Sequence, residues 1–135
     1  FPEPCLLARN DVIAMPHIGA STAEAEENCA VMAADQLMDF LENGNIKNSV
    51  NFPPVSMPRA NGGCCRVTFA NENVSGVLGN VLSVLADNNI NVVDMVNKSR
   101  GDIAYNIIDV ESCPIVEVAE AICQVKHVIN ARVLK

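Results

Sequence analysis

Two short stretches of the chain carry residues that could do chemistry. In "PHIGAST", His17 stands at the end of an apolar run, where an imidazole could act as a general acid and base. The second stretch is "NENVSG" (71–76), followed further along by Asn91. Asn73 and Asn91 each offer an acceptor oxygen and two donors, enough for the ammonium and the carboxylate of an amino acid. Asn73, Gly76 and Asn91 include no nucleophile or general base, so this set favours reversible binding.

Each set also has an ordinary structural interpretation. A single histidine in an apolar turn commonly has a packing role. No motif of the chain supplies an acidic residue that would orient His17. Asparagine and glycine most often simply make turns. In favour of binding, Gly76 permits close approach of a ligand, and the free N–H groups of a helix that starts there can hold a carboxylate.

The elements that must position His17 lie in residues 1–50. The run "DVIAM" (11–15) predicts a short buried strand, and Pro16 disfavours helix before it. Apolar residues at helical spacing predict a helix over residues 22–43, with a capping box formed by Ser21 and Glu24. Gly44 supplies the stop. This strand and helix resemble the end of a larger domain, because neither can cover its apolar side alone.

The rest of the chain divides into a connector and a small domain. Residues 51–63, "NFPPVSMPRANGG", predict an ordered strap that ends in a hinge at Gly62 and Gly63. Residues 64–135 alternate strand and helix patterns in the order βαββαβ. This order predicts an α+β, ferredoxin-like domain with a four-stranded antiparallel sheet and two helices on one face. The predicted strands cover residues 65–71, 90–98, 103–111 and 128–134, and the first predicted helix covers 75–88.

Composition narrows the classes of partner. The formal net charge of −7 argues against nucleic acid and against an anionic membrane surface. No apolar stretch approaches the roughly 20 residues of a membrane span. The cysteines form no Cys-x-x-Cys pair and neither histidine has zinc spacing to them, so no metal site is predicted. We interpret them as reduced thiols of a cytoplasmic protein. They are Cys5, Cys29, Cys64, Cys65, Cys113 and Cys123.

Three motifs in order resemble a known family. A strand, "NENVSGVL", a helix and then "NIN" resemble an ACT domain, the small-molecule sensor attached to many amino-acid enzymes. The strap "NSVNFPPVSMP" with its Gly-Gly, and "PHIGASTAEAEEN" with its helix, resemble the C-terminal portion of D-3-phosphoglycerate dehydrogenases. These NAD-dependent oxidoreductases commit 3-phosphoglycerate to serine synthesis. The resemblance extends from about residue 10 to the end.

For the N-terminal residues the resemblance implies catalytic roles in a whole enzyme. His17 matches the family's catalytic histidine, while Gly19 and Ala20 match the turn beside the nicotinamide and the substrate. Gly62 and Gly63 match the hinge between catalytic and regulatory parts. The chain has no Gly-x-Gly-x-x-Gly after a strand, so we expect these 135 residues alone to be inactive and to need no cofactor.

For the C-terminal residues the resemblance implies an effector site. Asn73 and Asn91 match amides that hold L-serine between the ACT domains of two subunits, beside Gly76. Asn71 stands where the serine-inhibited pattern has a histidine, and Val74-Ser75 replaces a basic residue and a proline. The effector is thus expected to be L-serine or a related small amino acid, in a dimer joined through ACT domains and a tetramer of the whole enzyme. The alternative is an oligomerisation module that binds no ligand.

Overall fold

The computed structural model describes residues 3–7, 9–59, 65–113 and 116–134. Its contacts divide the chain into two compact units, Phe1–Asp35 and Gln36–Lys135. The long helix α2 (Ala23–Asn43) crosses from the first unit into the second. None of the helices in the described ranges is long and apolar enough to cross a bilayer. The predicted boundaries at residues 50 and 63 stay predictions.

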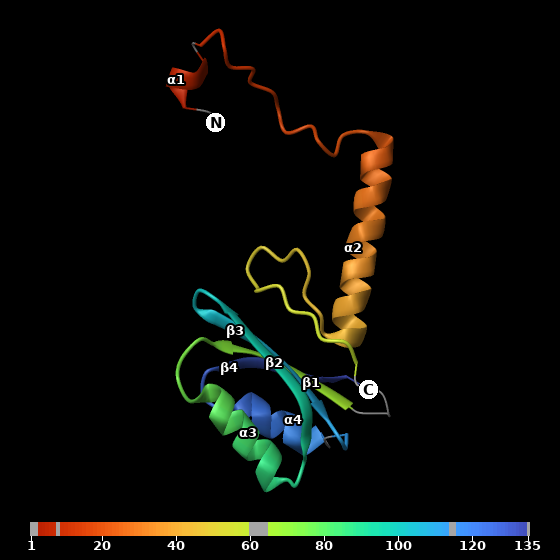
Figure 1. The fold of residues 1–135 in the computed structure, drawn as a ribbon, viewed down its shortest axis with the longest axis vertical. Helices are drawn as coiled ribbons and strands as arrows, with labels where there is room; N and C mark the ends of the chain where they lie inside the picture. The colour runs from red at the N-terminus through yellow and green to blue at the C-terminus, as the bar shows by residue number, and fades with distance from the viewer. Residues whose placement is uncertain (1–2, 8, 60–64, 114–115, 135) are drawn as a thin grey trace. The chain divides into compact units, whose positions relative to one another are not determined.

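The first unit has little regular structure before α2. It contains the one-turn helix α1 (Pro4–Leu7) and an exposed irregular segment, followed by the first half of α2 (Figure 1). The strand that we predicted at residues 11–15 is not formed, and that prediction was wrong. A strand needs a neighbour to pair its backbone groups, and none of the described residues pairs with this segment.

Helix α2 begins and ends close to the predicted residues. The cap at its start is Thr22, whose Oγ1 accepts a hydrogen bond from Ala25 N at 3.1 Å, so the cap predicted at Ser21 was off by one residue. The helix ends before Gly44, as predicted. Gly44 has φ +73°, and a Cβ there would lie 2.5 Å from Cγ2 of Thr68. Only glycine fits both that backbone conformation and that close approach.

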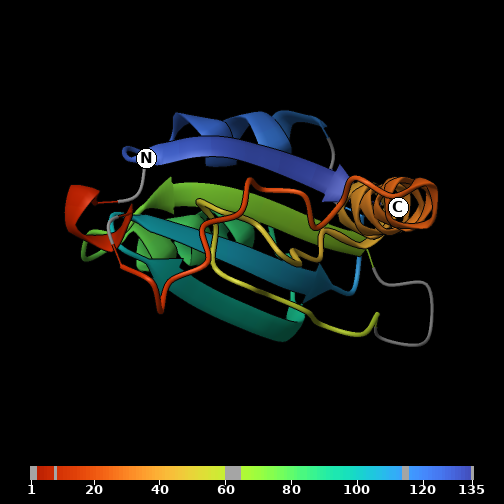
Figure 2. The ribbon, with the colours of Figure 1, turned by 90° about the horizontal axis from the view of Figure 1, so that it is seen from above.

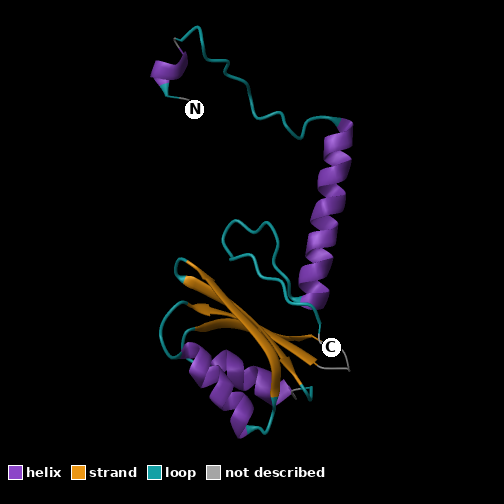
Figure 3. Cartoon of the chain, viewed as in Figure 1, coloured by secondary structure: helices purple, strands orange, loops and turns teal. Residues whose placement is uncertain are grey.

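The second unit is built around one antiparallel sheet (Figures 1 and 3). The strand order is β2-β3-β1-β4, and Figure 2 shows the four strands side by side. Helix α3 (Val77–Asp87) connects β1 to β2, and α4 (Val116–Gln124) connects β3 to β4. The ferredoxin-like βαββαβ arrangement predicted from the sequence is therefore confirmed. The strands are β1 (Cys65–Glu72), β2 (Val92–Arg100), β3 (Ile103–Val110) and β4 (Val128–Leu134).

The two helices cover one face of the sheet. Val77, Val81 and Leu85 lie one turn apart on α3 and are buried against the sheet, which is why this spacing folds as a helix here. From β1, Val67 and Phe69 point into the same core. Residues that alternate with them on β1 therefore face the other side of the sheet.

Residues 45–58, which we call the strap, cover the opposite face. Ile46 and Val55 pair in a short antiparallel bridge, and both are buried together with Met57 on Tyr105 and Ile107 of β3. This second core explains why β1 is buried on both faces from Cys65 to Asn71. The strap named here includes residues 51–58 of the segment predicted as an ordered strap (51–63), together with the preceding residues 45–50. The predicted hinge at residues 62–63 lies outside the described residues.

Candidate functional site

The loop between β1 and α3 holds the first predicted binding residues. Asn73 is exposed, and its backbone N donates to Asp102 O at 2.8 Å while its Nδ2 donates to Gly101 O at 3.0 Å. Gly76 caps α3 with φ +91°, and no atom lies within 4 Å of where its Cβ would be. No side-chain hydrogen bond caps this helix, so its first N–H groups have no side-chain partner at the end of the Asn73 loop.

Asn71 is held inside the domain. It is 4% exposed, and its Oδ1 accepts a hydrogen bond from Asn106 Nδ2 at 2.8 Å. Its own Nδ2 donates to Glu72 O at 2.6 Å. Asn106 in turn accepts from Asn97 Nδ2, so three amides from β1, β3 and β2 form a chain across the sheet. Asn71 therefore has a structural role, because its buried amide links the end of β1 to β3, whereas Asn73 two residues later is exposed.

A histidine that the sequence analysis missed lies at the same end of the sheet. His127 precedes β4 and adopts φ +72°, a conformation that is uncommon for residues other than glycine. Its Nδ1 lies 2.6 Å from Oε2 of Glu72, and its backbone O accepts from Glu72 N at 2.9 Å. The sequence could not have shown that these two residues meet, because their contact joins segments that only the pairing of β1 with β4 brings together.

Asn91 lies at the opposite end of the sheet from Asn73. Glu72, next to Asn73, pairs with Ile103 at the start of β3, whereas Asn91 precedes Val92, which pairs with Val110 at its end. Seven residue steps of β3 separate these pairs, or roughly 23 Å at the rise of a strand. The two predicted amides of one chain therefore cannot touch the same small ligand.

The three residues predicted for catalysis belong to the first unit. His17, Gly19 and Ala20 are exposed in the irregular segment before α2. Nothing lies within 4 Å of a Cβ placed on Gly19, and none of the described residues forms a hydrogen bond with the His17 ring. Among the described residues, no hydrogen bond or ion pair joins His17 to an acidic side chain.

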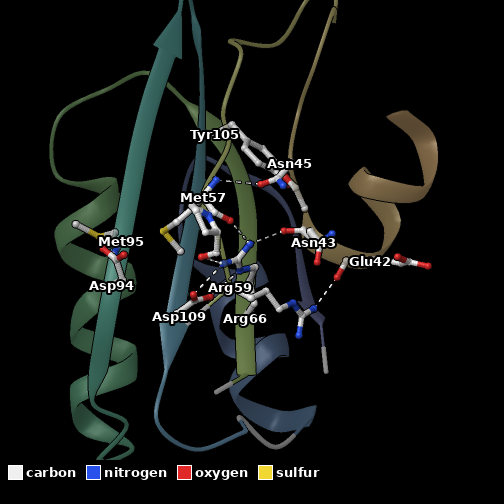
Figure 4. A network of polar contacts seen from close by, with 12 residues as sticks. Glu42, Asn43, Asn45, Met57, Arg59, Arg66, Asp94, Met95, Tyr105 and Asp109 are labelled. Carbon is white, nitrogen blue, oxygen red and sulfur yellow. Dashed lines mark hydrogen bonds and ion pairs between the residues drawn. The ribbon is translucent and has the colours of Figure 1, made fainter. Parts of the chain in front are cut away.

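One buried polar cluster was not predicted from the sequence (Figure 4). Arg66 is fully buried on the strap face of β1, and its Nε lies 2.6 Å from Oδ1 of Asp109 on β3. The same guanidinium donates to Asn43 O at 2.9 Å, Met57 O at 2.8 Å and Pro58 O at 2.9 Å. One side chain thus joins the sheet to the end of α2 and to the strap.

The cysteines differ from their predicted state. Cys65 at the start of β1 and Cys113 after β3 are joined as a disulfide, with Cα atoms 5.0 Å apart. That separation lies within the normal range for a disulfide. The prediction that all thiols are reduced is therefore corrected for this pair, which the register of β1 and β3 brings together. Cys5, Cys29 and Cys123 are free and exposed.

The fold defines the second unit as a ferredoxin-like α+β domain with a strap over its open face. Comparison with curated proteins then relates the chain to a particular enzyme. D-3-phosphoglycerate dehydrogenase of Haemophilus influenzae is 34% identical over 125 residues, which cover 93% of this chain and 30% of that protein. The Escherichia coli enzyme of the same name is 34% identical over 83% of this chain and 27% of its own length. A putative D-3-phosphoglycerate dehydrogenase of Schizosaccharomyces pombe is 39% identical over 76% of this chain and 22% of that protein.

The chain is therefore homologous to the C-terminal part of D-3-phosphoglycerate dehydrogenases, and it spans less than a third of their length. The resemblance drawn from the sequence motifs is confirmed. No family model matches the chain. Among solved structures, the ACT domain from GTP pyrophosphokinase of Chlorobium tepidum aligns with a TM-score of 0.47 and 12% identity, over 53% of this chain and 96% of that one. At that level of likeness the fold assignment rests on the strand order given above.

Proposed function

We propose that this chain is the regulatory part of an NAD-dependent D-3-phosphoglycerate dehydrogenase of L-serine biosynthesis. In this proposal its ferredoxin-like unit is an ACT domain, and two copies bind L-serine or a related small amino acid between them. The homology to these dehydrogenases supports the identity of the parent enzyme. The open loop with Asn73 and the uncapped start of α3 offers an amide and free N–H groups that suit a zwitterionic amino acid.

The separation of Asn73 from Asn91 is the observation that carries the proposal of an intermolecular site. One small amino acid cannot span the roughly 23 Å of strand between them, so a ligand held by both amides must take them from two chains. The strand β2 can join two chains, because it lies at one edge of the sheet and is mostly exposed.

Antiparallel pairing of two β2 strands would bring the required residues together. In such a pair the start of one β2 faces the end of the other. The partner's Asn91 would then approach this chain's Gly101, whose carbonyl already accepts from Asn73 Nδ2. Both sites of the symmetric dimer form in the same way, since a two-fold interface repeats every contact.

The proposal is tested first by calorimetry of the purified chain with L-serine. Asn73→Ala and Asn91→Ala should each remove the heat of binding while leaving the melting temperature nearly unchanged, because both residues are exposed. Asn51→Ala, a change of an exposed strap asparagine, is the matched control and should bind as the parent chain does. No heat with the parent chain at millimolar L-serine would contradict serine sensing.

A mixing experiment distinguishes a site between chains from a site within one. If Asn73→Ala and Asn91→Ala chains are unfolded together and refolded as an equal mixture, half of the dimers are mixed, and each mixed dimer keeps one intact site. The mixture should then recover about a quarter of the parent's binding capacity. A site within one chain would recover none.

The cofactor and the catalytic residues are proposed for the whole enzyme. NAD would supply the hydride acceptor, with His17 as the proton donor and acceptor and Gly19 and Ala20 beside the nicotinamide. The described residues do not build a dinucleotide site around them, since His17 lies in an irregular segment without a strand–turn–helix unit. We therefore derive no catalytic step from this chain.

The alternative function is an oligomerisation module of the same enzyme without a ligand. The observation that favours it is the exposed nine-residue edge of β2, which pairing with a second copy would cover without any effector. A stable dimer in sedimentation that gives no heat with any small amino acid would support this alternative.

A further inference from the structure

We propose that Cys65 and Cys113 form a thiol–disulfide switch, set by a small disulfide such as oxidised glutathione, which locks one end of the sheet. The proposal is independent of the effector site. It is based on the different exposure of the two cysteines and on the Arg66–Asp109 pair next to Cys65.

The two cysteines have unequal access to solvent. Cys65 is 4% exposed and packs in the core between the sheet and the helices, whereas Cys113 is exposed in the connection between β3 and α4. When one cysteine of a disulfide is exposed, a thiolate from solution can attack it, and the thiol of the buried cysteine is then the leaving group. A crosslink sealed inside the core would not exchange in this way.

The exchange balances with one molecule of the oxidant. The Cys113 thiolate attacks one sulfur of oxidised glutathione, which forms a mixed disulfide and releases one glutathione thiolate. The Cys65 thiolate then attacks Sγ of Cys113 and releases the second glutathione. The protein loses two hydrogens, and the two glutathione molecules gain the two protons and the two electrons. Excess reduced glutathione reverses both steps.

The position of the crosslink ties it to the strap. In the β1–β3 register Cys65 pairs with Val110, directly beside the Arg66–Asp109 pair. Arg66 donates to the carbonyls of Met57 and Pro58 at the end of the strap. The disulfide therefore fixes the same pair of strand ends that carries the Arg66 contacts. Closing it should slow the opening of the strap.

The free cysteines of the described residues differ from this pair. Cys5, Cys29 and Cys123 are exposed, but none of them is joined to another described cysteine. Among the described cysteines, only Cys65 and Cys113 are joined as a disulfide, and one of the two is buried while the other is exposed.

The test equilibrates the purified chain in a series of buffers from reduced to oxidised glutathione, then traps free thiols by alkylation for mass spectrometry. We expect the Cys65–Cys113 crosslink to appear progressively across the series, with a peptide map that joins these two residues. A crosslink that persists in reduced glutathione alone would overturn the proposal, because the bond would then be permanent. Free thiols at both positions in oxidised glutathione alone would also overturn it.

Stability and hydrogen exchange provide the second readout. The crosslink closes a loop with a sequence separation of 48, so the oxidised chain should melt about 5 to 15 °C above the reduced one. Amide exchange at Ile46 and Val55 should be slower in the oxidised chain. Cys113→Ser should abolish both differences, and Cys123→Ser, a change of an exposed free cysteine, should keep them. Equal melting and exchange of the parent chain in both states would contradict the switch.

Discussion

Arg66 is a fully buried cation on β1, and most of the other buried residues of this strand are apolar. Removing a guanidinium from water is costly, and it is tolerated here because five contacts replace the lost hydration. Two contacts go to the Asp109 carboxylate in a bidentate pair, which is the geometry that arginine favours over lysine. The remaining three go to the main-chain carbonyls of Asn43, Met57 and Pro58, so this residue also positions the end of α2 and the end of the strap.

Replacing Arg66 should therefore be more damaging than removing a salt bridge at the surface. Arg66→Lys keeps the charge but cannot reach all five acceptors, and we expect the free energy of unfolding in urea to fall by about 3 kcal/mol or more. The double variant Arg66→Met/Asp109→Leu should recover much of that loss, because no buried charge is left without its partner. Arg9→Met, which breaks the exposed pair with Asp11, is the control and should leave stability unchanged. A Lys variant as stable as the parent would contradict this account.

At the scale of elements, Tyr105 links β3 to the end of α2. Its hydroxyl donates to Gly44 O at 2.9 Å, and its ring meets Phe52 of the strap edge to face, with centroids 5.9 Å apart. Burial raises the pKa of Tyr105 above its ordinary value, because the phenolate would lose hydration, and the hydrogen bond with Thr68 and the charges of Arg132 and Arg66 offset part of that rise.

This raised pKa predicts a loss of stability in alkali. The neutral phenol is favoured in the folded chain, so its contribution is complete below the ordinary pKa of tyrosine and is lost as the pH rises through the folded pKa. Because Tyr105 is the one tyrosine of the chain, the phenolate absorbance reports it directly, and its midpoint should lie above that of free tyrosine. Tyr105→Phe should lower stability by about 1 kcal/mol at neutral pH and weaken the alkaline loss. A midpoint equal to that of free tyrosine would contradict the prediction.

The elements themselves were largely predictable, and their partners were not. Helical spacing at Val77, Val81 and Leu85 and the turn at Gly101 are local signals, and the corresponding elements formed within about two residues of their predicted bounds. The apolar run at 11–15 has the local pattern of a strand, but it has no strand to pair with among the described residues. The pattern alone therefore gave a wrong prediction. Local spacing could not predict Arg66 with Asp109 or Cys65 with Cys113, because each contact depends on the register between β1 and β3.

The residues of the candidate site also differ in whether local sequence could suggest them. The amides at 73 and 91 were found by type and by position next to predicted elements, which a sequence can supply. Their opposite places on the sheet follow from the antiparallel order of β1, β3 and β2, which fixes distance across the domain. His127 and Asn106 were missed because they reach the site from another turn and another strand.

At the scale of the whole molecule, the proposed function requires two chains to meet at one of the two edges of the sheet. The edges are β2 and β4, and each carries an exposed apolar residue, Met95 on β2 and Ile129 on β4. Only pairing through β2 brings the end of one strand, near Asn73, to the start of the other, near Asn91. The two edges can therefore be distinguished by placing the same charge on each.

Met95→Lys should weaken dimer formation by about tenfold or more, because a lysine near the middle of an edge strand opposes its pairing with a second copy that carries the same charge. Ile129→Lys adds the same charge to the other edge and should leave the association unchanged. Sedimentation velocity over a range of concentrations measures both, and each variant should melt close to the parent, because both side chains are partly in solvent, with 39% of Met95 and 60% of Ile129 exposed. If Ile129→Lys alone gives monomers, the chains pair through β4, and the ligand cannot lie between Asn73 and the partner's amide. Since L-serine would bind across β2 only in the dimer, the affinity for L-serine should fall in Met95→Lys and persist in Ile129→Lys.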